Sequence, residues 1–316
     1  MKTLFVNMLE SGQAVDEIFL VSEKHLAHKK DGAPYLLLTL ADKAGSIKAV
    51  AWDNVRELAE RFVAGNYVRL KGSVSNYRDR LQVTVRNLEI CEKDAVSVED
   101  YIPSSERDSG NMMAGLISIC SAIEDPYLKK LLDAFFEDRE FVTAFSKAPA
   151  GKKMHHAYVG GLLEHTLSLV FLVQKIGDHY DGINKDLLMV GAVLHDIGKI
   201  HELCYETHID YSDAGRLLSH IVIGLEMLEA KIAKIKDFPE ELSLLLKHMI
   251  VSHHGTRDFG SPEPPKTLEA VILHYLDELD SKVNGIRSFM ASEDPEAAWT
   301  SYHRILERFF YKGKQT

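Results

Sequence analysis

The pair His195-Asp196, within the run Leu-His-Asp-Ile-Gly-Lys at 194–199, most constrains how this chain can fold. An imidazole beside a carboxylate can bind one divalent metal ion, but a complete site needs ligands from other segments. Such residues occur in apolar segments with helical periodicity at His165, His220, His253 and Asp277. Side chains so far apart in sequence converge only when their helices pack side by side. The pattern therefore predicts an all-α bundle around a metal centre.

The chemistry of these six ligands predicts the kind and number of ions. Imidazole together with carboxylate suits manganese, iron, cobalt, nickel or zinc better than calcium, which prefers all-oxygen sites. Six ligands are too many for one ion that keeps a position open for water, so we expect two divalent transition-metal ions. Asp196 is the natural bridge, because its two oxygens can bind one ion each. Two ions can activate a water and neutralise phosphodiester oxygens, so phosphodiester hydrolysis is the expected reaction.

Two cations near these ligands are candidates for binding phosphate. Lys199 lies one helical turn beyond His195 and can reach a phosphate; equally, it can complement the dipole at a helix C-terminus. Arg216 lies four residues before His220, so on a continuous helix the two side chains face the same side. We assign Lys199 and Arg216, together with Asp196, to catalysis.

Two pairs of ligand-type residues leave a choice open. His253 and His254 are adjacent and cannot point the same way on a helix, so one binds metal and the other faces substrate or supports a ligand. We assign His253 to the metal and His254 to catalysis. Asp277 and Asp280 are three residues apart and share one side of a helix, so either can bind the ion while the other orients a ligand.

The segment from about residue 12 to residue 91 has the pattern of five short strands, with a helix at 53–62 between the third and fourth. This is the order of an OB-fold barrel. The strands are expected at 15–21, 35–41, 46–52, 67–74 and 81–90, and a polar loop at 75–80 joins the last two. Aromatic residues that can stack on bases and cations that can contact phosphates make one wall a candidate nucleic-acid surface. These candidates are Tyr35, Trp52, Arg69, Lys71, Tyr77, Arg78 and Arg80.

The domain organisation follows from the change of pattern along the chain. Residues 98–111 carry a proline, serines, a glycine and alternating charges, as expected of a linker. We therefore expect a multidomain α+β protein: a barrel over 1–97, a linker over 98–111 and a helical bundle over 112–316. An amphipathic segment at 299–310 is expected to pack back on the bundle.

Charge and cysteine content exclude several classes of protein. The net charge of −10 excludes a broadly basic nucleic-acid-binding protein, but residues 1–95 carry 14 Lys and Arg against 13 Asp and Glu. A local basic groove on the barrel is compatible with that near-neutral balance. Three cysteines in no metal-binding spacing fit a reducing compartment. No apolar run approaches the length of a membrane span, so we expect a cytoplasmic protein without a membrane partner.

Taken together, these features resemble the bacterial YhaM-type 3′→5′ exoribonuclease family, in which an OB-fold barrel precedes a helical domain of the HD phosphohydrolase superfamily. The resemblance rests on segments 155–166, 194–199, 215–221, 252–255 and 274–280, which read HHAYVGGLLEHT, LHDIGK, GRLLSHI, SHHG and HYLDELD. It implies metal-dependent removal of nucleotides from the 3′ end of single-stranded RNA, with DNA as a second candidate substrate. Manganese is the favoured ion in that family, and homo-oligomers are common. The family register also favours Asp277 as the ligand, with Asp280 orienting another ligand.

The expected function is therefore a nuclease whose barrel holds a single strand and whose bundle cleaves it. Two alternatives remain open at this stage. One is an HD phosphohydrolase that acts on a nucleotide or cyclic dinucleotide, with a regulatory barrel. The other is a non-enzymatic nucleic-acid-binding protein whose metal is structural.

Overall fold

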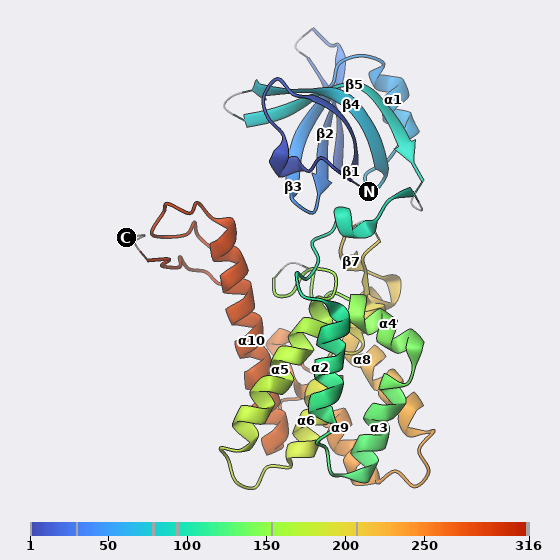
Figure 1. Cartoon of the computed structure of the whole chain (residues 1–316), viewed down its shortest axis with the longest axis vertical. Helices are drawn as coiled ribbons and strands as arrows, with labels where there is room; N and C mark the ends of the chain where they lie inside the picture. Colours follow the sequence, from blue (N-terminus) through green and yellow to red (C-terminus); the bar gives the residue numbers. More distant parts are fainter. Residues whose placement is uncertain are drawn as a thin grey trace. The chain divides into compact units, whose positions relative to one another are not determined.

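The computed structural model describes residues 2–29, 31–77, 80–92, 95–152, 154–206 and 208–313 (Figure 1). The chain forms two compact units, Met1–Ser104 with Tyr205–Ile209, and Ser105–Cys204 with Asp210–Thr316. The first is a closed five-stranded barrel and the second is mainly helical, so the predicted fold class is confirmed. In the described part of the chain, no helix is long and apolar enough to cross a membrane.

The barrel closes in the strand order β1-β2-β3-β5-β4, with β3 parallel to β5 and the other pairs antiparallel. Alternate residues point inward and form the core, including Phe19, Leu36, Leu70 and Val83, which are fully buried. The short 3-10 helix η1 (Val6–Met8) precedes the first strand, and helix α1 (Val55–Arg61) lies between β3 and β4. The strands are β1 (Ala14–His28), β2 (Pro34–Asp42), β3 (Gly45–Ala51), β4 (Tyr67–Tyr77) and β5 (Arg80–Cys91).

Strands β4 and β5 extend further than their hydrophobic alternation predicts. The two strands stay paired as far as Tyr77 and Arg80, so most of the predicted loop at 75–80 is strand. Tyr77 therefore lies at a strand end. Arg78, which was predicted to bind nucleic acid, lies outside the described residues.

The helical unit places five ligand-bearing helices against one another. Helix α5 packs on α6 and α10, and α9 packs on α6, α8 and α10. Helix α5 is buried nearly all round, as its composition predicts. The helices are α2 (Ser109–Cys120), α3 (Pro126–Phe136), α4 (Arg139–Lys147), α5 (Gly161–Gly177), α6 (Lys185–Leu194), α7 (Lys199–Glu202), α8 (Asp213–Ile232), α9 (Glu240–Ser252) and α10 (Leu268–Ser292), with short strands β6 (Leu203–Cys204) and β7 (Asp210–Tyr211) and 3-10 helices η3 (Val98–Asp100) and η4 (Arg257–Phe259).

Three expectations about this unit differ from the structure. Helix α2 begins at Ser109, inside the segment predicted as linker. The sequence pattern predicts continuous helices over 185–197 and 213–235, but α6 ends at Leu194 and α8 is interrupted at Ser219, where φ is 61° and ψ is 163°. The last two changes occur beside predicted ligands, so the ends and breaks of these helices position the site.

Candidate metal centre and nucleic-acid groove

All six predicted metal ligands lie in one cluster in the helical unit. His165 comes from α5, His220 from α8 and Asp277 from α10. His195 caps α6, and Asp196 follows in the turn before α7. His253 caps α9. The four histidines and Asp196 are at most 7% exposed, so the cluster belongs to the interior of the bundle.

One group of donor atoms surrounds His165 Nε2. This nitrogen lies 3.3 Å from His195 Nε2, 3.2 Å from Asp277 Oδ1 and 3.9 Å from Asp196 Oδ2. His195 Nε2 is 3.3 Å from the same Asp196 oxygen. Two imidazoles and two carboxylates with ligand atoms so close form a donor set typical of a divalent transition metal.

A second group of donor atoms faces the other oxygen of Asp196. Asp196 Oδ1 lies 3.6 Å from His220 Nε2 and 3.6 Å from His253 Nε2. These three atoms are buried and have no hydrogen-bond partner, although buried polar atoms are nearly always paired. A bound cation would satisfy these three unpaired acceptor atoms, which converge on one point, so the residues fit a second ion.

His254 lies beside this second group, contrary to the expectation that His253 and His254 face different ways. His220, His253 and His254 each offer a ligand atom within 4.8 Å of the others. The expectation assumed that both histidines lie inside a helix, but α9 ends at Ser252, with His253 as its C-cap and His254 in the turn that follows. Gly255 follows with φ of 79°, and a Cβ there would lie 2.2 Å from the His274 ring.

Hydrogen bonds fix which nitrogen of each ring faces the centre. The Nδ1 atoms of His195, His253 and His254 lie 2.7–2.9 Å from the backbone carbonyls of Ala192, Ile250 and Phe259. A carbonyl only accepts, so each Nδ1 must donate, and the neutral ring keeps a lone pair on Nε2. Such partners are typical of histidines that bind metal.

Carboxylates hold the remaining two histidines in the same way. His165 Nδ1 lies 2.8 Å from Asp280 Oδ2, which also lies 3.1 Å from His156 Nε2. Asp280 therefore contacts the outer side of His165, whereas Asp277 contacts Nε2 on the inner side. His220 donates from both its backbone N–H and its Nδ1 to Glu202 Oε1, each at 2.8 Å.

Close backbone approach brings His220 to the His195-Asp196 turn. A Cβ at Gly198 would lie 2.0 Å from the His220 carbonyl oxygen, so only glycine fits between the turn and α8. The left-handed φ at Ser219 lets the chain bend there, at a conformational cost of about 1 kcal/mol or more. Gly198 and the strained Ser219 therefore allow His220 to join the second group of donor atoms.

The electrostatics of the centre favour a bound cation. Burial acts to raise the pKa of Asp196, but Lys199 and His195 hold it well below its usual range. Burial also acts to raise the pKa of Asp277, but its hydrogen bond to His165 together with the charges of His195 and His165 lowers it. Burial acts to lower the pKa of His165, yet Asp277 and Asp280 raise it to about 9. The centre therefore attracts positive charge even inside the bundle.

A cavity of about 470 Å³ opens beside the second group. Lys199, His220 and His254 line it, together with Lys152, His155 and Tyr211. Lys199 Nζ lies 2.6 Å from Asp196 Oδ2, and the carboxylates raise the pKa of Lys199 although burial opposes this. Lys199 lies in α7, a helix of a single turn, and its ammonium is directed to Asp196. It places a buried positive charge between the metal centre and the cavity.

Arg216 is not placed as the sequence predicts. The break at Ser219 separates it from His220, so the argument from a shared helix side is wrong. Its guanidinium instead lies 3.2 Å from Asp210, which also pairs with Lys152 at 2.5 Å. Contact between Arg216 and phosphate stays a prediction without this geometric support.

Two residues of the centre were missed by sequence reasoning. Glu202 carries no recognisable signal, because its bond to His220 depends on the turn after Gly198. His155 lines the cavity, and burial together with Lys199 lowers its pKa to about 3. The only signal for it is the His155-His156 doublet shortly before α5.

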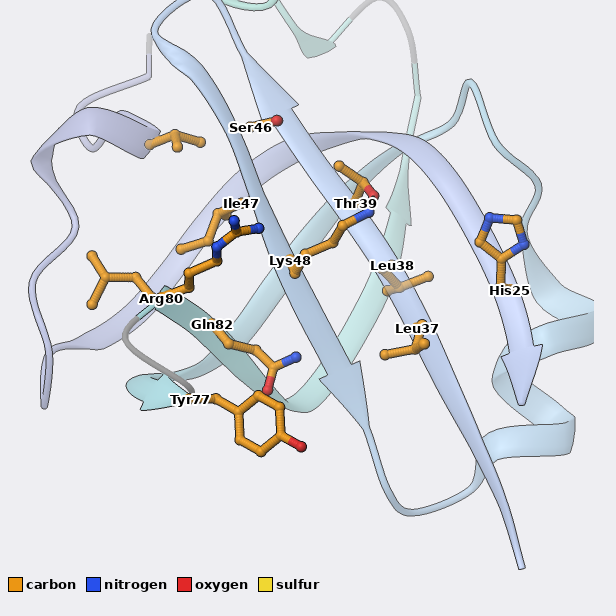
Figure 2. Close-up of a pocket in the computed structure, with 12 residues that line it drawn as sticks. His25, Leu37, Leu38, Thr39, Ser46, Ile47, Lys48, Tyr77, Arg80 and Gln82 are labelled. Carbon is orange, nitrogen blue, oxygen red and sulfur yellow. Dashed lines mark hydrogen bonds between the residues drawn. The ribbon is translucent and has the colours of Figure 1, made fainter. Parts of the chain in front are cut away.

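The barrel has its own groove, of about 950 Å³, across β2, β3 and the start of β5. Figure 2 shows Tyr77, Arg80 and Gln82 beside Lys48, with Leu37 and Thr39 on the neighbouring strand. Tyr77 is 57% exposed. Arg80 has no ion-pair partner among the described residues, whereas Lys48 pairs with Glu23 at 2.9 Å. A half-exposed aromatic ring beside an arginine fits a strand of nucleic acid.

The other predicted nucleic-acid residues lie elsewhere on the barrel. Tyr35 and Trp52 stack on each other with ring centroids 5.1 Å apart. Arg69 and Lys71 lie on β4 and pair with Asp16 on β1, at 2.8 and 3.7 Å, and neither lines the groove. The predicted cationic wall is thus partly neutralised by an acidic residue on the adjacent strand.

Comparisons with known proteins agree with this division of the chain. Residues 20–91 match the family model of the OB-fold nucleic acid binding domain, and residues 162–282 match that of the HD domain. Among solved structures, the match to the second OB-fold domain of replication protein A from Methanococcus maripaludis covers 28% of this chain and 94% of that domain's chain. The two are 22% identical, and the TM-score is 0.24, which is too low to support an argument.

Similarity to curated proteins extends over nearly the whole chain. The 3′-5′ exoribonuclease YhaM of Geobacillus sp. (strain WCH70) is 33% identical over 304 residues, which cover 96% of this chain and 93% of that protein. YhaM of Bacillus subtilis (strain 168) is 32% identical over 96% of both chains. This chain therefore joins an OB-fold barrel to an HD domain and belongs to the YhaM family of 3′-5′ exoribonucleases.

Proposed function

We propose that this protein is a metal-dependent 3′→5′ exoribonuclease that removes nucleotides from single-stranded RNA. One observation carries the proposal: Asp196 turns one oxygen to each of two groups of imidazole and carboxylate donors. A shared carboxylate between two cation sites is the arrangement of hydrolases that act on phosphate esters. The family named above supplies the class of substrate.

We propose two divalent ions for this centre, with manganese favoured over iron, cobalt, nickel and zinc. The first would be held by His165, His195, Asp196 and Asp277, and the second by Asp196, His220, His253 and His254. When bound, such a pair lowers the pKa of a water and neutralises charge on the phosphate. Asp280 and Glu202 would orient His165 and His220 from outside.

The protein's own residues account for binding and orientation beside the centre. Lys199 keeps its proton and holds Asp196 in place, and its ammonium lines the cavity that would receive a phosphate. Tyr211 lines the same cavity and is 42% exposed, which leaves its ring surface available to a base. Lys152 stays near the cavity through its pair with Asp210.

We further propose that the barrel groove at Tyr77 and Arg80 binds the strand, and that single-stranded DNA can occupy it as well. Stacking on an aromatic ring does not distinguish RNA from DNA, because both present bases. Cytoplasmic location and assembly into homo-oligomers are part of the same proposal and rest on family resemblance. The domain limits 1–97, 98–111 and 112–316 are proposed as functional boundaries.

The test is the product pattern on RNA that is labelled at its 5′ end. An exonuclease of this polarity shortens the labelled strand one nucleotide at a time and releases mononucleotides. Free nucleotides and a cyclic dinucleotide, assayed with the same manganese, should be hydrolysed far more slowly. If either small substrate were hydrolysed faster than RNA, the protein would instead be a nucleotide phosphohydrolase.

Metal content tests the centre independently of activity. His253→Gln should lower the number of manganese ions per reconstituted chain, whereas His248→Gln on the same helix should not. His248 is a matched control because its Nε2 accepts from the backbone of Lys266 and does not face Asp196. One ion per wild-type chain would contradict the two-ion proposal.

A further inference from the structure

Residues 299–313, which we call the C-terminal hairpin, follow α10 (Figure 1). They carry exposed aromatic side chains. Backbone bonds pair its two arms: Thr300 N–H donates to Phe310 O and His303 N–H to Arg308 O, each at 2.9 Å. The segment was expected to be amphipathic and to pack back on the bundle. In the structure it forms an irregular hairpin that packs on the C-terminal part of α10.

The C-terminal hairpin has two different faces. On one face, His303 and Phe310 pack on Phe289 of α10, with ring centroids 4.5 and 6.4 Å from it. On the other face, aromatic residues pair across the arms with ring centroids 5.0 and 5.2 Å apart. These outward residues are about half exposed: Trp299, Tyr302, Phe309 and Tyr311. Grouped apolar side chains exposed in this way mark a binding surface.

Charge distinguishes the kind of partner. Residues 96–298 carry 19 Lys and Arg against 33 Asp and Glu, whereas the hairpin, residues 299–313, carries three against one. Arg304 and Arg308 are exposed and pair with no carboxylate in the part of the chain described. The C-terminal hairpin therefore reverses the sign of the unit that carries it, which attracts a polyanion.

We propose that the C-terminal hairpin is a second binding surface for single-stranded nucleic acid, separate from the barrel groove. Paired aromatic rings receive bases, and Arg304 and Arg308 contact phosphates. Aromatic rings interleaved with cations are the general means by which proteins bind single strands without sequence preference. The role as a substrate-binding surface rests on the proposed function, but binding itself does not.

The chain offers a direct probe, because Trp52 and Trp299 are its only tryptophans. In the full-length Trp52→Phe variant, Trp299 alone reports by fluorescence. Titration with single-stranded RNA of about 20 nucleotides, with a chelator present to prevent hydrolysis, should quench this signal as the base stacks. If the signal stays constant while fluorescence anisotropy shows that the RNA is saturated with protein, the proposal is wrong.

Exposed charges can be removed without disturbing the fold. Arg304→Ala/Arg308→Ala should weaken RNA binding about fivefold or more and lower the log–log salt dependence by about 1.4, for two lost contacts. Arg139→Ala, which removes an exposed arginine on α4, is the matched control and should bind as wild type. Equal weakening by the control would show only a general charge effect and would overturn the proposal.

A second copy of the chain is the competing occupant, and sedimentation velocity separates the two. Arginine variants that bind RNA as wild type but form smaller assemblies would show that the C-terminal hairpin is a protein interface. The proposal for the C-terminal hairpin and the proposed exoribonuclease function can also be refuted independently of each other. Loss of mononucleotide release with intact Trp299 quenching would refute the exoribonuclease and leave the binding surface standing.

Discussion

Replacing Asp196 by asparagine tests the metal centre most sharply, because the substitution keeps the shape and removes only the charge and one oxygen. Each donor group would lose a carboxylate ligand. We expect hydrolysis of RNA to fall at least about a thousandfold, which corresponds to about 4 kcal/mol of activation free energy. RNA binding measured with a chelator should stay within about threefold of wild type, because the barrel groove lies outside the centre.

The same substitution has a predictable effect on stability without metal. Lys199 Nζ lies 2.6 Å from Asp196 Oδ2 and its side chain is 10% exposed, so Asp196→Asn would leave a buried ammonium without its nearest charged partner. Breaking such a pair costs about 3–5 kcal/mol of unfolding free energy. Adding Lys199→Met to Asp196→Asn should recover most of that loss but none of the activity.

The assays for this pair of variants are urea unfolding, followed by far-UV circular dichroism with a chelator present, and release of mononucleotides with manganese. Asp258→Asn is the matched control, since this aspartate is exposed in η4 and should change neither measurement. Activity of Asp196→Asn above a tenth of wild type would refute the bridging role. Unchanged stability without metal would refute the argument about the buried lysine.

Three further predictions concern the supporting residues. Glu202→Ala should lower metal affinity about 10- to 100-fold by freeing the His220 ring, and Glu202→Gln, which keeps an acceptor, should restore much of it in equilibrium metal titrations. Tyr77→Ala and Arg80→Ala should weaken cleavage of a strand of about 20 nucleotides far more than cleavage of a dinucleotide, and equal effects on both would place these residues in the fold or the active site. Burial raises the pKa of Cys120 to about 12, so at pH 8, well below that value, its thiol stays protonated and should resist iodoacetamide in the native protein. Mass spectrometry would contradict this if the thiol were alkylated before urea is added.

Residue types and spacing were sufficient to find the metal ligands, because ligand chemistry restricts each position to a few residues and a bundle brings distant helices together. His165 and Asp277 are 112 residues apart, yet their ligand atoms lie 3.2 Å apart. The barrel was likewise predictable from alternation, since the inward residues of a closed sheet must be apolar. In both cases the prediction depends on the pattern of a whole helix or strand, so an error of one or two residues at its end does not change it.

What the sequence did not predict depends on exact helix ends and on pairing across strands. The choice between His253 and His254 assumed a continuous helix through both residues, but α9 ends at Ser252, before either of them. Arg216 was placed by a helical register that Ser219 interrupts. Lys71 seemed available to nucleic acid, yet the closed barrel pairs its strand with β1 and brings Asp16 within 3.7 Å.

The two failures in the helical unit, at His254 and Arg216, share a physical cause that also explains where the second donor group comes from. His220, His253 and His254 all lie where a helix bends or stops. Ser219, just before His220, and Gly255, just after His254, adopt positive φ, and Gly198 leaves room for the backbone of His220. A regular helix would direct adjacent histidines to different sides. An irregular one can direct both to Asp196, at a cost in backbone strain that tertiary packing must offset. The residue types were sufficient to predict His220 and His253 as ligands, whereas the place of His254 depended on the backbone beyond the end of α9.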